Sequence, residues 1–122
     1  MTYQSKSIMF EEVQHLSYDS KMNIMRKAKE IGCDWHSDIL NCSKSFRRMK
    51  IDIDFEEALK EFKEDDLSHF TIIKRDTYGE NHIEICWNTM GLTNDYFIWL
   101  HLDLDNIPIV EGFIKEELGI KN

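Results

Sequence analysis

Two segments in the last third of the chain constrain its fold most strongly, because both alternate apolar and polar residues at the period of a β-strand. They are residues 81–88 (NHIEICWN) and 95–105 (DYFIWLHLDLD), and a turn over residues 91–94 (GLTN) joins them. A connection this short permits only antiparallel neighbours. We therefore predict an antiparallel hairpin.

The apolar pattern also predicts the register of the hairpin. One face becomes apolar when Ile83 lies opposite Leu102, Ile85 opposite Leu100 and Trp87 opposite Ile98. A slip of one residue would set apolar side chains against polar ones, so we expect this pairing to hold. The other face then carries three pairs, which are His82 with Asp103, Glu84 with His101, and Cys86 with Trp99.

A further strand is expected before the hairpin, at residues 70–73 (FTII), with a turn at residues 78–81 (YGEN). These β-branched and aromatic residues favour strands. The three strands then form an antiparallel meander. Two orientations of the first strand stay open, with either Phe70 and Ile72 or Ile73 facing the core.

Helices are expected before the strands. Met9, Val13 and Leu16 have the spacing of a short amphipathic helix, and a second helix begins at Ser20 as its N-cap and ends at Gly32. A third apolar stripe runs from residue 34 at intervals of three and four and predicts another helix; its members are Trp35, Ile39, Cys42, Phe46 and Met49.

Two more helices complete the prediction. Asp54 begins one that continues to about Glu64, and Asp105 or Asn106 caps a closing helix with Pro108 in its first turn. We expect the closing helix to turn three residues inward, namely Ile109, Phe113 and Ile114. The predicted fold is a single α+β domain over residues 1–122, with N-terminal helices, a three-stranded antiparallel β-meander and a C-terminal helix packed on one face of the sheet.

The charge balance limits the classes of partner. Fifteen basic residues against twenty-three acidic ones give a net charge of -8, which opposes contact with nucleic acids and anionic membranes and favours a basic protein partner. No apolar run approaches the roughly 20 residues of a membrane-spanning helix. Three cysteines without a disulfide spacing or a signal peptide favour the cytoplasm.

The polar face of the hairpin is the first candidate site. His82, Glu84, His101 and Asp103 lie within cross-strand reach in the predicted register. Imidazoles and carboxylates in such a group hold a divalent metal or act as a general acid and base. The commoner explanation is charge-complementary pairing on a solvated face, and both interpretations stay open. A second group, Cys33, His36 and Cys42, lacks the remaining half of a zinc pattern, so we expect Cys42 to pack in the core.

The second candidate is a protein-binding surface. Phe97 and Trp99 lie on the face opposite the predicted core, where they are either covered or exposed to a partner. A run of carboxylates offers a surface that steers a basic partner, and its members are Glu57, Glu61, Glu64, Asp65 and Asp66. The commoner role of such a run is a solvated helix face.

No phosphate-binding loop, dinucleotide motif or hydrolase motif occurs in the chain, so we expect no cofactor and favour a non-enzymatic protein over an enzyme, with the question of activity left open. The favoured hypothesis is a small acidic protein-binding inhibitor of the immunity, antitoxin-like or anti-defence type, which occludes a basic site on its partner. The alternative is a protein that binds a metal or small ligand at the histidine and carboxylate cluster, with a small enzyme included in that class. A third hypothesis is a homo-oligomer paired through Phe97 and Trp99.

Overall fold

The computed structural model describes residues 13–41, 48–64, 67–77, 80–91 and 93–119. In chain order the elements are η1 (Val13–His15), α2 (Tyr18–Glu30), β1 (Asp34–Asn41), β2 (Arg48–Ile51), α3 (Phe55–Leu59), β3 (Ser68–Thr77), β4 (Glu80–Thr89), β5 (Asn94–Asp103), η2 (Leu104–Asn106) and α4 (Ile107–Leu118). The α+β class predicted from the sequence is confirmed.

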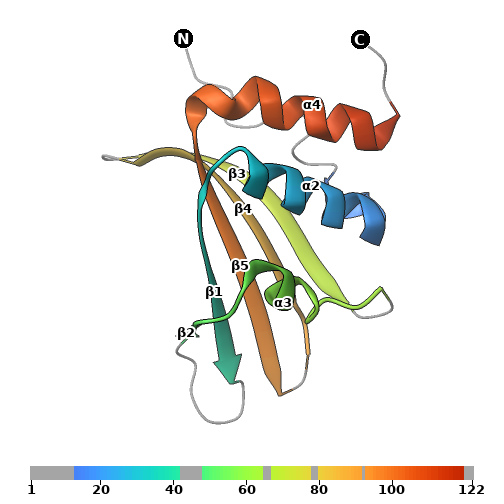
Figure 1. The fold of residues 1–122 in the computed structure, drawn as a ribbon, viewed down its shortest axis with the longest axis vertical. Coiled ribbons are helices and arrows are strands. Elements are labelled where there is room, and N and C mark those ends of the chain that lie inside the picture. Colours follow the sequence, from blue (N-terminus) through green and yellow to red (C-terminus); the bar gives the residue numbers. More distant parts are fainter. Residues whose placement is uncertain (1–12, 42–47, 65–66, 78–79, 92, 120–122) are drawn as a thin grey trace.

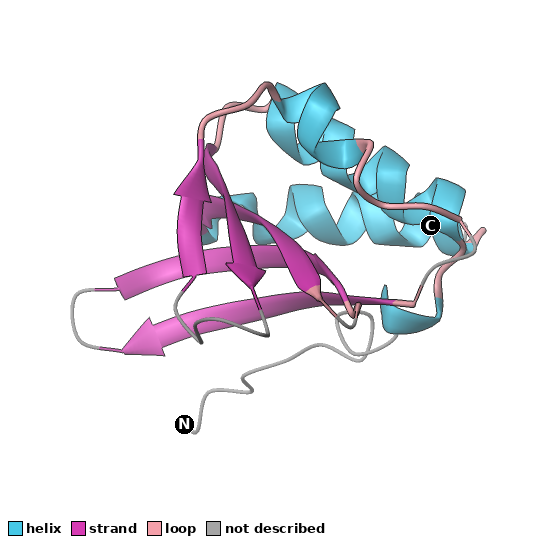
Figure 2. Ribbon diagram, turned by 90° about the horizontal axis from the view of Figure 1, so that it is seen from below, coloured by secondary structure: helices cyan, strands magenta, loops and turns pink. Residues whose placement is uncertain are grey.

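The strands form one five-stranded antiparallel sheet in the order β2-β1-β5-β4-β3 (Figure 1). The predicted meander is present as β3-β4-β5, but the sheet is larger, because β1 pairs with β5 and β2 continues the sheet beyond β1. The two long helices, α2 and α4, lie on the same side of the curved sheet (Figure 2). We call that side the inner face and the opposite side the outer face.

The helix predicted from residue 34 to Met49 is wrong, because this segment supplies strands β1 and β2. Trp35 and Ile39 are four residues apart, so they share a face in a helix and also in a strand, and their spacing alone does not separate the two. All of β1 pairs with residues 94–101 of β5, which satisfies backbone groups of β1 and decides for the strand. Cys42 and Phe46 lie outside the described residues.

The other helices differ from the prediction at their ends. Helix α2 begins earlier than expected, because the Oγ of Ser17, and not that of Ser20, caps it by accepting a hydrogen bond from the Ser20 N–H at 3.1 Å. Gly32, with a positive φ of 84°, follows the helix as predicted. Helix α3 is only five residues long and does not reach Glu64. In the first predicted helix only η1 falls among the described residues, and Met9 does not.

Helix α4 starts next to Asn106 with Pro108 in its first turn, as predicted. The expectation that Ile109 faces inward is wrong, since this side chain is 44% exposed while Val110 is fully buried. Val110 and Ile114 are four residues apart and therefore share the helix face that meets the core. Phe113 is partly buried against the same core.

The core lies between the inner face and the helices. Trp87 of β4 is at its centre, stacked on Phe62 at 4.4 Å between ring centroids and edge-on to Phe70 at 5.7 Å. Phe70 and Ile72 are buried, which decides the orientation of β3 in favour of this pair. The residues that alternate with the core residues of β1, β4 and β5 therefore lie on the outer face.

Candidate metal centre

The outer face of β4 and β5 has the register predicted from the sequence. His82 lies opposite Asp103, and Glu84 lies opposite His101, while Ile83 and Ile85 between them are fully buried in the core. The predicted pairing is therefore confirmed. It places the polar candidates side by side on the outer face.

Three of the four candidates converge on one point. The ligand atoms offered by His82, Glu84 and His101 all lie within 4.8 Å of one another. Glu84 and His101 are directly opposite across the two strands, and His82 is diagonal to His101, with 5.1 Å between the ring centroids. Asp103 is opposite His82 but is exposed and is not part of this convergent group. We call His82, Glu84 and His101 the His-Glu-His cluster.

The side chains of this cluster are largely shielded from solvent, which affects their protonation. Glu84 is only 8% exposed, and the Nε2 of His82 is buried without a hydrogen-bond partner. Burial lowers the pKa of His101 from its ordinary value of 6.5, against the opposing effect of the Glu84 carboxylate. A lowered pKa favours the neutral imidazole, which is the form that donates a lone pair to a metal.

The spacing of the cluster suits a small transition-metal ion. Zinc holds nitrogen and oxygen ligands at about 2.0–2.2 Å, so its ligands are about 3.3–3.6 Å apart in a tetrahedron. The ligand atoms of the cluster lie within 4.8 Å of one another, which is at most about 1.5 Å wider than that spacing. Three protein ligands also leave a fourth position for water or another ligand. Two imidazoles and one carboxylate suit zinc and iron(II). Magnesium and calcium fit less well, because both prefer oxygen ligands alone.

Strand β1 extends this surface with a residue that the sequence did not assign to it. The ring of His36 stacks on His101, with 5.5 Å between centroids and 13° between planes, and also on Trp99 at 6.1 Å. Asp38 accepts a hydrogen bond from the Trp99 indole N–H at 3.1 Å. The erroneous helix prediction concealed His36, although its alternation with the inward Trp35 and Ser37 at a period of two was a usable signal.

The cysteines do not form a second centre among the described residues. Cys33 packs against the core and is half-buried, whereas His36 lies on the outer face, and Cys42 is not described. Cys86 lies on the outer face of β4, two residues after Glu84, but burial raises the pKa of its thiol to about 12. This thiol is therefore protonated and a poor ligand at neutral pH.

The predicted protein-binding residues are divided between the two sides of the sheet. Phe97 and Trp99 stack on the outer face at 5.9 Å, both half-buried, and the guanidinium of Arg48 lies over them at 5.4 and 5.1 Å. Glu57 is exposed on α3, which packs on the inner face. Glu61 and Glu64 follow α3, and Asp65 and Asp66 lie outside the described residues. The aromatic pair and the α3 carboxylate therefore do not share one surface.

These features define a small α+β protein with a helix-covered antiparallel sheet and a His-Glu-His cluster on its outer face. No protein-family model matches the chain, and the comparisons with curated proteins and with solved structures found no match. Within the described part of the chain, every helix is too short or too polar to cross a membrane.

Proposed function

We propose that this protein binds a divalent transition-metal ion through His82, Glu84 and His101. The observation that carries the proposal is the convergence of their ligand atoms to within 4.8 Å on two paired strands. Zinc is the ion that fits the ligand set best, because two nitrogen ligands and one oxygen ligand match its preferences and leave a fourth position open.

The burial of the cluster supports metal binding over ordinary charge pairing on a solvated face. A solvated pair would hold a protonated histidine next to Glu84, yet Glu84 is buried and the pKa of His101 is lowered. A buried imidazole nitrogen without a partner, such as the Nε2 of His82, costs free energy that a metal bond would offset. The ion would also neutralise the carboxylate.

Calorimetric titration of the metal-free protein with zinc tests this proposal. We expect one ion per chain, with binding weakened by more than about 100-fold by His101→Ala and by Glu84→Gln, since each removes a direct ligand and loss of an outer partner alone costs about 10- to 100-fold. His15→Ala and His69→Ala are matched controls, because both histidines are exposed and lie outside the cluster. Equal zinc affinity in the cluster variants and in the controls, with folding checked by circular dichroism, would overturn the proposal.

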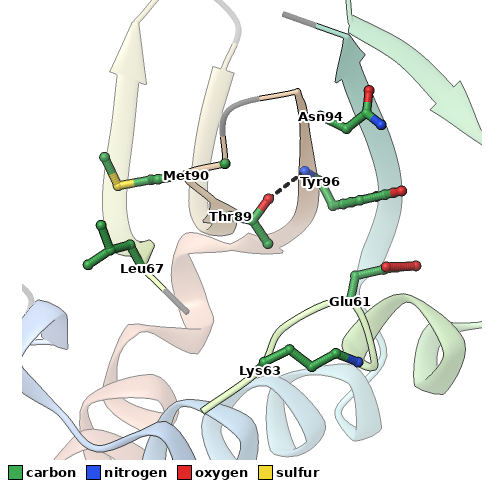
Figure 3. Close-up of a pocket in the computed structure, with 8 residues that line it drawn as sticks. Glu61, Lys63, Leu67, Thr89, Met90, Asn94 and Tyr96 are labelled. Carbon is green, nitrogen blue, oxygen red and sulfur yellow. Dashed lines mark hydrogen bonds between the residues drawn. The ribbon is translucent and has the colours of Figure 1, made fainter. Parts of the chain in front are cut away.

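A second function, binding of a basic protein partner, is favoured by one surface groove with both apolar and polar walls. This groove of about 490 Å³ has Leu67 and Met90 on one side, 76% and 55% exposed, while Glu61 and Tyr96 lie across from them (Figure 3). Exposed large apolar side chains beside a carboxylate suit a partner that presents a basic and an apolar residue together. The net charge of -8 would draw such a partner in.

We therefore propose as the second candidate an inhibitor of the immunity, antitoxin-like or anti-defence type that uses this groove. The free thiols of Cys33 and Cys86 support a reducing, cytoplasmic location for either function. The test is recovery of the tagged protein from its host, with wild type compared with Leu67→Ser and Met90→Ser. Met49→Ser is the matched control, since Met49 is 65% exposed on β2. A basic protein lost from both groove variants but retained by the control supports the candidate, and equal recovery from all variants contradicts it.

A further inference from the structure

Lys21 is a buried lysine on the core side of helix α2. It is three and four residues before Ile24 and Met25, which are fully buried, so the helix turns all three side chains to the same side. Only 8% of Lys21 is exposed, whereas lysine is almost never buried unless it is paired.

Lys21 has no ion-pair partner among the described residues. The other basic residues of α2 that form ion pairs use different carboxylates: Arg26 binds Glu56 at 2.9 Å, and Lys27 binds Glu116 at 3.0 Å. The carboxylate of Glu64 lines the same cavity as Lys21 but forms no ion pair with it. Burial without a counter-charge lowers the pKa of Lys21 below its ordinary value of 10.5. A buried and unpaired ammonium group is costly, and an anionic ligand would offset that cost.

The side chain of Lys21 lines a cavity of about 260 Å³ between α2 and β3. Its walls combine apolar and polar side chains, and the full set is Leu16, Tyr18, Lys21, Lys63, Glu64, Leu67, Ser68 and Trp87. This volume is comparable to the lower end of small-molecule pockets.

Apart from the Glu64 carboxylate, the polar side chains of this cavity keep hydrogen-bond donors available. The Tyr18 hydroxyl already donates to the Phe62 carbonyl at 2.9 Å, and Ser68 Oγ already accepts from the Trp87 indole at 3.0 Å. The hydroxyl proton of Ser68 and the ammonium of Lys21 are not used in these bonds. The ammonium of Lys63, the other lysine at the cavity, donates to the Lys60 carbonyl. The remaining donors therefore suit an acceptor with a negative charge.

We propose that this cavity binds a small organic carboxylate, held by the ammonium of Lys21 and the hydroxyl of Ser68 with its apolar part against Leu16 and Trp87. The ammonium groups of Lys21 and Lys63 and the carboxylate of Glu64 give the cavity lining a net charge of +1, which fits a monoanion and disfavours a phosphate dianion. The cavity lies on the inner side of the sheet, so the site is separate from the His-Glu-His cluster and does not depend on it.

Titration of the isotope-labelled protein with acetate, butyrate and benzoate, followed by amide and indole NMR signals, tests the proposal. We expect saturable shifts at Tyr18, Ser68 and the Trp87 indole, and tighter binding of the two larger anions because they fill the apolar wall. Lys21→Met should weaken binding by at least about tenfold, while Lys21→Arg keeps the charge and retains it. Lys60→Met is the control, because Lys60 is exposed and outside the cavity.

Several outcomes overturn the carboxylate site. One is the absence of shifts with all three carboxylates at millimolar concentrations. Another is binding that persists unchanged in Lys21→Met, and a third is inorganic phosphate binding as tightly as benzoate. If Lys21→Met fails to fold, Lys21→Gln, which removes the charge and keeps a polar group, takes its place with the same expected loss.

Discussion

The imidazole rings of His82 and His101 lie 5.1 Å apart on neighbouring strands, inclined at 61° to each other. This proximity follows from the register of β4 and β5, which makes the two residues diagonal neighbours on the outer face. A slip of one residue would move one of the rings to the inner face, among the core side chains. The candidate centre therefore exists only while the apolar pairs of the inner face hold the two strands in register.

Because the pKa of His101 is lowered in the folded protein, we expect the protein to lose stability in weak acid. The pKa is lowered first by burial, so below pH 6.5 the unfolded chain takes up a proton that the folded chain resists. The free energy of unfolding should therefore fall as the pH drops from 7.5 through 6.5 toward the lowered pKa. Urea denaturation of wild type and His101→Gln measures this, and the variant should lose less stability over that range. An equal fall in stability in both proteins would show that His101 is not the cause of the pH dependence.

The thiol of Cys86 should be inert in the folded protein. Its pKa is about 12 because of burial, with the Glu84 carboxylate as a further contribution, so almost no thiolate exists near neutral pH. We expect iodoacetamide at pH 8 to leave Cys86 unmodified until urea unfolds the chain, as read by mass spectrometry of its peptide. Rapid alkylation of the native protein at Cys86 would contradict the burial of this side chain.

Replacement of Lys21 by methionine should stabilise the fold. Methionine keeps the length of the side chain and removes a buried ammonium that has no ion-pair partner among the described residues, so the free energy of unfolding should rise by about 1 kcal/mol. Thermal or urea denaturation at pH 7 measures the change, and Lys60→Met, at an exposed position, should shift it little. A large loss of stability in Lys21→Met would show that the ammonium has a favourable partner.

Helix α4 offers a direct test of the inward face. Val110→Ala should destabilise the protein by about 2 kcal/mol, because it removes fully buried methyl groups. Ile109→Ala removes a side chain that is 44% exposed and should cost less than about 0.5 kcal/mol. Denaturation of the two variants under the same conditions compares them. A larger loss of stability in Ile109→Ala than in Val110→Ala would contradict the exposed position of Ile109 and support the inward orientation predicted from the sequence.

The sequence predicts the β4-β5 register because Ile83, Ile85 and Trp87 alternate strictly with polar residues, and period two has no helical counterpart over that length. The same alternation locates the His-Glu-His cluster. Strand β1 escapes prediction since Trp35 and Ile39 fit both periods, and only its pairing with the distant β5 decides between them.

Two site residues, His36 and Lys21, were not assigned to a site from the sequence, for similar reasons. His36 reaches the outer face only because β1 is a strand, so the error in secondary structure hid it. Lys21 occupies the apolar stripe of α2 with Ile24 and Ala28, at intervals of three and four, and that position was a visible signal. Among the described residues the ammonium of Lys21 has no ion-pair partner, and this depends on the tertiary packing around the cavity, which no local pattern in the sequence encodes.

The most direct measurement of the central claim is a nitrogen-15 NMR spectrum of the imidazole groups with and without one equivalent of zinc. The metal-bonded nitrogens of His82 and His101 should shift on binding, and their rings should become fixed in one tautomer, because the nitrogen that binds the metal cannot carry the proton. The exposed His15 and His69 should keep their signals. Unchanged signals of His82 and His101 at saturating zinc, or shifts confined to the exposed histidines, would contradict metal binding at the His-Glu-His cluster.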